Sequence, residues 1–245
     1  MSIIIFIPQL LLAQSDITFI NGFEKQVIFN DTGVTWAGHS SQANNTICES
    51  DMSLPQDCDH GRDSSGMTNI NEDGAAGFSF TKLDTFGNPL SNNAELWSCV
   101  KDNITGLTWE IKTTSEGVHN KDNKYQWGGI TSIGINHPDR IGDYFEPSWN
   151  KLINISNNSV FCGKNNWRAP TIDELSGLGN YSTFLPAIDT NFFPYTLNEV
   201  RSTFWSASPT ALFDNSAWVV YFREARIKIV ARDSLQRIRL VSDKQ

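Results

Sequence analysis

From residue 97 onward, short apolar segments alternate with polar turns. Residues 97–100 form an apolar run, a turn containing Gly106 follows, and residues 107–112 alternate between apolar and polar side chains with a period of two. That period is typical of a strand with one buried face. The two segments therefore predict a β-hairpin.

A helical pattern replaces this alternation further along the chain. Between residues 143 and 156, apolar side chains recur three and four positions apart, which predicts an amphipathic helix. Thr171 and Glu174 have the spacing of a capping box and predict the start of a second helix. Gly179 is expected to end that helix.

Strand patterns then return in four segments, which are residues 202–206, 217–223, 226–231 and 237–241. Strands, two helices and strands again predict an α+β fold with an antiparallel sheet. Residues 14–95 are rich in Asn, Asp, Ser, Thr and Gly, with strand-like runs at 26–29 and 77–81. We interpret them as a loop- and strand-rich N-terminal extension.

The first thirteen residues are mainly apolar and are followed by Gln14, Ser15 and Asp16. This run is too short to span a bilayer as a helix and has the length of the apolar part of a secretory signal. It predicts a secreted or surface protein. Because no Lys or Arg precedes the run, a start further upstream or a buried strand is the alternative. No other run is long and apolar enough for a membrane helix.

Composition and charge narrow the classes of function. The 245 residues include 39% hydrophobic and 11% aromatic ones, enough to bury a core. A formal net charge of −8 argues against general nucleic-acid binding. Residues 223–239 nevertheless hold six basic and two acidic side chains, so this stretch is +4 and the rest of the chain is −12.

The basic stretch contains our candidate ligand-binding residues. Period-two alternation places Tyr221 and Arg223 on one side of their strand, and Arg226, Lys228 and Arg232 fall on the same side if the next strand pairs with it. Such a cationic face suits the sulfate or carboxylate groups of a polysaccharide or surface protein. The alternative is an ordinary solvated sheet face.

A segment that starts at Asn69 is similar to the opening of a calcium loop. Asn69, Asn71 and Asp73 supply oxygen atoms at positions one, three and five, and Gly74 occupies position six. Position twelve is Phe80, where a calcium loop has a glutamate. Ca²⁺ is therefore a candidate cofactor, and a polar turn is the simpler interpretation. No other cofactor is expected.

The four cysteines, Cys48, Cys58, Cys99 and Cys162, include no closely spaced pair, and the four histidines do not complete a zinc site. Two disulfides in an exported protein account for the number, and three pairings are open. We find no nucleophile elbow, phosphate loop or zinc-protease helix, so we expect a protein that is not an enzyme. Two converging carboxylates of a glycosidase remain an alternative.

Several segments occur in an order and spacing that characterise a known family. They are residues 99–102, 105–110, 162–163, 167–171, 174–175, 186–189, 193–194, 204–206, 217–222 and 239–241. Together they resemble the C-terminal domain of Legionella-type collagen-like adhesins. The resemblance covers about residues 96–242, so we divide the chain into 1–13, 14–95 and 96–245.

This resemblance implies a C-type-lectin-like fold, export, and adhesion to sulfated polysaccharide. It also implies that Cys99 pairs with Cys162, which leaves Cys48 to pair with Cys58. Some members assemble as trimers, but the collagen-like repeats that organise them are absent here, which weakens the expectation of a homo-oligomer. A lectin-like adhesion module is the expected function. A structural subunit of a surface fibre or coat, and a carbohydrate-active enzyme, are the alternatives.

Overall fold

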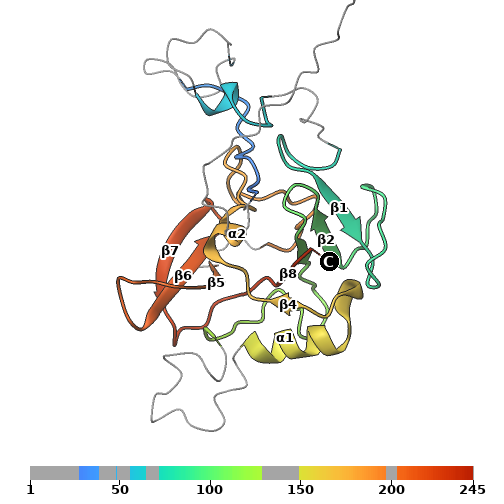
Figure 1. The fold of residues 1–245 in the computed structure, drawn as a ribbon, viewed down its shortest axis with the longest axis vertical. Coiled ribbons are helices and arrows are strands. Elements are labelled where there is room, and N and C mark those ends of the chain that lie inside the picture. Colours follow the sequence, from blue (N-terminus) through green and yellow to red (C-terminus); the bar gives the residue numbers. More distant parts are fainter. Residues whose placement is uncertain are drawn as a thin grey trace, which may run out of the picture.

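The computed structural model describes residues 28–38, 48, 56–64, 72–128, 149–196 and 203–244. These residues form two antiparallel β-sheets, two α-helices and short 3₁₀ turns. In the view of Figure 1 the two sheets lie on either side of helix α2. The predicted α+β class is confirmed. The predicted single sheet is divided into two. Of the strand predicted at 26–29, residues 26 and 27 lie outside the described residues, and residues 28 and 29 do not form a strand.

The larger sheet has the strand order β1-β2-β3-β8-β4. Its strands are β1 (Phe80–Leu83), β2 (Cys99–Asp102), β3 (Thr108–Glu110), β8 (Val241–Ser242) and β4 (Trp167–Arg168). The predicted hairpin is β2–β3, in which Val100 lies opposite Trp109. Strand β8 pairs with both β3 and β4, so residues from opposite ends of the domain are neighbours in one sheet.

The strand predicted at residues 237–241 is shorter than expected, because its residues bind different partners. Arg237 exchanges backbone hydrogen bonds with the start of the smaller sheet, at Thr203 and Trp205. The Leu240 N–H donates to the Glu110 side chain at 2.8 Å instead of to a backbone carbonyl. Regular pairing therefore begins only at Val241.

The smaller sheet has the order β5-β6-β7, with β5 (Thr203–Pro209), β6 (Ser216–Tyr221) and β7 (Arg226–Ala231). Tyr221 lies opposite Arg226, and Val219 lies opposite Lys228. Val219 and Val220 are both fully buried, but they belong to different hydrophobic clusters. Since neighbouring residues of a strand point to opposite faces, β6 is buried on both sides.

The two clusters form the core of the domain. The first contains Phe80 and Trp109 of the larger sheet, Leu175 of α2, and Phe222, which follows β6. The second contains Trp127, Trp149, Trp167 and Trp205. Each of these large rings removes a large apolar area from water.

Helix α1 (Trp149–Asn158) buries Trp149, Leu152 and Ser156 along one face, as its spacing predicts. Helix α2 (Ile172–Ser176) begins at Thr171 with both bonds of the capping box. It ends at Gly177 rather than at the predicted Gly179, because tight turns close its last residues. A Cβ at Gly179 would lie 3.0 Å from the Cβ of Ala225, so glycine is needed there for close packing instead.

Thr171→Ala is expected to lower the free energy of unfolding by about 1 kcal/mol, because the hydroxyl accepts the Glu174 N–H at the start of α2. Urea denaturation measures the change. Thr190→Ala is the control, since Thr190 is also exposed and its side chain has no hydrogen bond in the described part of the chain. A threonine-to-alanine change that costs the same at both positions would contradict a capping role.

Candidate functional site

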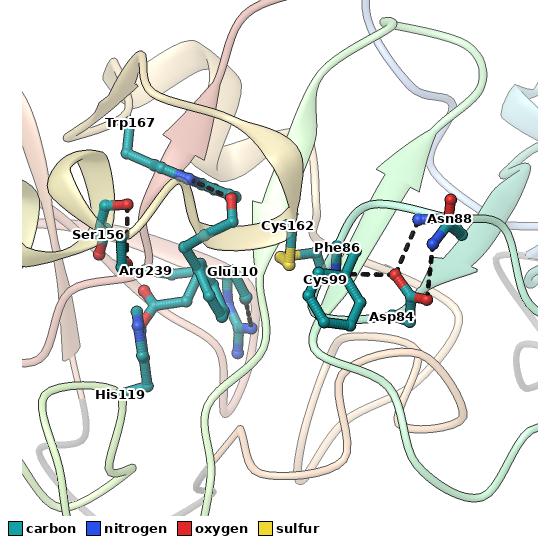
Figure 2. Close-up of a disulfide and its surroundings, with 12 residues drawn as sticks. Asp84, Phe86, Asn88, Cys99, Glu110, His119, Ser156, Cys162, Trp167 and Arg239 are labelled. Atoms are coloured by element: carbon teal, nitrogen blue, oxygen red, sulfur yellow. Dashed lines mark hydrogen bonds and ion pairs between the residues drawn. A yellow bond between two sulfur atoms is a disulfide. The ribbon is translucent and has the colours of Figure 1, made fainter.

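The disulfides fix the framework around the candidate surfaces. Cys99, the first residue of β2, is bonded to Cys162 in the turn after α1, with a Cα–Cα distance of 6.4 Å (Figure 2). Cys48 is bonded to Cys58 within the extension. Both predicted pairings are confirmed. Cys99 and Cys162 are buried, and their bond joins the larger sheet to the turn that follows α1.

A buried ionic cluster lies near this disulfide and was not predicted. Glu110 is fully buried, and its Oε1 atom lies 2.7 Å from both Lys112 Nζ and His119 Nδ1. Arg239 donates to the backbone carbonyl of Glu110 at 2.7 Å and to the hydroxyl of Thr196 at 2.7 Å. Figure 2 shows Glu110, His119 and Arg239 together. The expectation of one buried face for residues 107–112 is therefore wrong, because paired charges allow the polar face to be buried as well.

Burial and neighbouring charges shift the pKa values of Glu110, Lys112 and Arg239. Burial opposes ionisation of Glu110, but Lys112 and His119 outweigh that effect and lower its pKa to about 2. Burial lowers the pKa of Lys112, although Glu110 counteracts the shift. Burial likewise lowers the pKa of Arg239 to about 10. The hydrogen bond from Arg239 to the Glu110 carbonyl holds the segment before β8 against β3. The cluster therefore has a structural role.

The structure divides the five residues predicted to form one cationic face. Tyr221 has an exposed fraction of 4% and Arg232 one of 7%, so neither lies on an open surface, and that part of the prediction is wrong. The Nε of Arg232 donates to the Ser216 carbonyl at 3.1 Å, and its guanidinium lies 4.3 Å from the Trp127 ring. The period-two pattern of the sequence could not predict the burial of Tyr221 and Arg232, because it does not reveal whether other side chains cover that face.

Three cations remain accessible at the β6–β7 hairpin. We define Arg223, Arg226 and Lys228 as the β7 cationic surface. Arg226 has 57% of its side chain exposed and is ion-paired with Glu224. Lys228 is half-buried, with its Nζ 3.8 Å from the centre of the Tyr221 ring. The predicted proximity of Tyr221 to Arg226 and Lys228 is thus present, with the tyrosine beneath the cations.

The predicted calcium loop cannot be followed as a whole, since Asn69 and Asn71 lie outside the described residues. Asp73 is described, and its Oδ2 accepts the hydroxyl of Ser79 at 2.6 Å. Phe80, at position twelve, is buried in the first cluster. Among the residues that the structure describes, no group of three His, Cys, Asp or Glu side chains could hold a metal ion.

Two hollows lie elsewhere on the domain. A polar groove of about 720 Å³ is lined by Lys82, Trp97 and several Asn, Ser and Thr side chains. Lys82 is buried there, with its Nζ 3.7 Å from the centre of the Trp97 ring, and donates to the Ala94 carbonyl at 2.9 Å. A smaller cavity of about 150 Å³ lies between α2 and the extension. Sequence reasoning missed both, since their residues come from distant segments.

In the described ranges, no helix has the length and apolar character needed to cross a membrane. Comparison with known proteins then bears on the class of the domain. The sequence model of the Lcl C-terminal domain matches residues 98–242. No curated protein and no solved structure matches the chain.

Proposed function

The chain belongs to the Lcl C-terminal domain family, and on that premise we propose that it is an extracellular adhesion protein that binds an anionic glycan through the β7 cationic surface. The domain is of an adhesin type, which supports a surface role. The two disulfides support export, because such bonds persist mainly in oxidising compartments. A C-type-lectin-like arrangement is part of the same proposal.

The observation that carries this proposal is the exposure of Arg226 and the partial exposure of Lys228 at the hairpin of an otherwise acidic protein. Glu224 is the acidic partner of Arg226, and it compensates one of the three cations. The remaining positive charge can attract sulfate or carboxylate groups through charge-assisted hydrogen bonds. The Tyr221 ring beneath Lys228 restricts the ammonium group and so reduces the entropy lost on binding.

The double variant Arg226→Ser with Lys228→Ser is expected to bind immobilised heparin at least about tenfold more weakly, since hydrogen bonds to charged groups contribute about 1.5–3 kcal/mol each. Binding by the parent protein should weaken steeply with salt. The thermal midpoint should fall only slightly, because Arg226 is exposed and the contact of the half-buried Lys228 with the Tyr221 ring contributes about 0.5–1 kcal/mol.

The matched control is Lys101→Ser with Lys124→Ser, which removes the same charge from two other exposed positions. Equal loss of binding in both double variants would mean that net charge alone is responsible. Unchanged binding in the first double variant would place the glycan site elsewhere on the protein.

We further propose that the protein binds its glycan without chemical change. The polysaccharide recovered after long incubation should then keep its original length, as measured by gel filtration. A shortened polysaccharide would favour the alternative of a carbohydrate-active enzyme.

A second candidate function, a structural subunit of a surface fibre, is favoured by the position of β7 at the end of its sheet. In the described part of the chain β7 pairs with β6 alone, and Ile227 on it is 43% exposed. Edge strands can add a strand from another chain. Sedimentation over a range of concentrations distinguishes the two candidates, because a fibre subunit should associate without any glycan.

A further inference from the structure

The polar groove of about 720 Å³ is lined by two loops that are far apart in the sequence. Residues 91–93 belong to the loop between β1 and β2, and residues 190–192 belong to the loop between α2 and β5. We call this space the Trp97 groove, after the tryptophan that links its two loops. Its volume lies within the range of about 300–1,000 Å³ that is typical of ligand sites.

Hydrogen bonds hold both walls of the groove in place without any ligand. The Nε1 of Trp97 donates to the Phe192 carbonyl at 3.0 Å and so ties one loop to the other. The Nζ of Lys82 donates to the Ala94 carbonyl at 2.9 Å and lies 3.7 Å from the centre of the Trp97 ring. Asp189 accepts backbone N–H groups from its own loop and from the extension. Because the walls are already fixed, a ligand would order little of the chain when it binds.

The side chains on these walls keep their polar groups for a ligand. Asn93 on one wall and Thr190 and Asn191 on the other are exposed, and within the described ranges their side chains make no hydrogen bond. An amide supplies two donors and an acceptor, and a hydroxyl can donate and accept. The groove therefore matches a ligand whose groups also donate and accept, which is the hydrogen-bonding pattern of sugar hydroxyls.

The charges of the groove favour a ligand without a net charge. The two charged side chains of its lining, Glu72 and Lys82, have opposite signs. The ammonium of Lys82 already contacts the Trp97 ring and the Ala94 carbonyl. It also lies in the field of Asp189, which counteracts the lowering of the Lys82 pKa by burial. Neither an anion nor a cation gains strongly from such a lining.

The apolar part of the lining is small. Among the described residues that line the groove, only Trp97 and Phe192 are apolar. Trp97 is half-buried, so part of its ring can contact the C–H groups of a sugar. An extended peptide could use the same amides, but it would find few apolar pockets for its side chains.

We infer that the Trp97 groove binds a neutral oligosaccharide through the amide and hydroxyl groups of its two loops. This site is separate from the β7 cationic surface and differs from it in the charge of its ligand. It does not depend on the proposed binding of an anionic glycan, so either conclusion can fail without the other.

The test begins with an array of neutral oligosaccharides, to which the full chain is applied at low and at high salt. We expect at least one of them to bind, with an affinity that salt leaves unchanged, because an uncharged ligand is not screened. The bound oligosaccharide is then titrated into the ¹⁵N-labelled full chain. Asn93→Ala and Asn191→Ala identify the two side-chain amide resonances by their disappearance. In the parent protein both resonances should shift and saturate together.

The double variant Asn93→Ala with Asn191→Ala removes one amide from each wall. It should bind the oligosaccharide at least about tenfold more weakly, because two hydrogen bonds are lost. Its thermal midpoint should stay unchanged, since both side chains are exposed and make no hydrogen bond within the described ranges. The matched control is Asn154→Ala with Asn158→Ala, which removes two exposed amides from α1 and should bind as the parent does.

The remaining outcomes decide between the groove and other sites. Arg226→Ser with Lys228→Ser should keep its binding of the neutral oligosaccharide, even if it loses heparin. No binding on the array, an equal loss in the two asparagine double variants, or unshifted amide resonances would each overturn the inference. Tetra-alanine is titrated in the same way. A shift of both resonances with this peptide and not with the oligosaccharides would mean that the groove takes peptides instead.

Discussion

Replacing Cys99 and Cys162 together by alanine is expected to lower the free energy of unfolding by about 4 kcal/mol. The bond closes a loop with a sequence separation of 63, and the chain-entropy model assigns about that value to a loop of this length. Both residues are buried, and the variant lacks the covalent link between β2 and the turn after α1. Urea denaturation of the parent and the variant measures the difference.

The Cys48–Cys58 pair provides the internal comparison. Its sequence separation is only 10, for which the same model gives about 3 kcal/mol as an upper value. It closes a loop in the extension, so its removal should affect the main unfolding transition less than removal of the Cys99–Cys162 bond. The reverse order of the two effects would contradict our view of which disulfide holds the domain together.

Glu110→Gln is expected to destabilise the protein by about 3–5 kcal/mol, because it leaves the buried ammonium of Lys112 without a carboxylate. Lys112 has an exposed fraction of only 3%, so water cannot replace the lost partner. Glu116→Gln is the matched control, since Glu116 is exposed. Chemical denaturation at neutral pH should show a large effect for the first change and little for the second.

The same variant predicts a pH dependence. The pKa of Glu110 is about 2 in the folded protein, against an ordinary value of 4.5. Its contribution to stability is therefore fully present above pH 4.5 and is lost as the pH falls toward about 2. Between these values the difference in unfolding free energy between the parent and Glu110→Gln should shrink. A difference that stays constant across this window would mean that the cluster does not lower the pKa of Glu110.

The local features of the fold could be predicted where neighbouring residues determine them. Thr171 and Glu174 are three positions apart and cap α2 without help from distant segments. The β2–β3 hairpin follows from alternation around one turn. The disulfide pairing followed from the resemblance to a family, since the spacing alone left three choices.

Features that depend on distant partners could not be predicted. Alternation gives the period of a strand but not what covers each face, so it misplaced Tyr221 and Arg232 and left Glu110 on an open face. Glu110 is buried because Arg239 and His119 reach it from other segments. The smaller cavity between α2 and the extension combines Asn30 and Trp109, which nothing in the local pattern connects.

The place of β8 between β3 and β4 has a consequence for the timing of folding. Thr108 pairs with Ser242, so the larger sheet remains incomplete until the ribosome has released nearly all of this domain. Such long-range pairing slows folding and leaves strand edges exposed in the meantime. The nascent chain that a chaperone meets is therefore one in which β3 still lacks its neighbour.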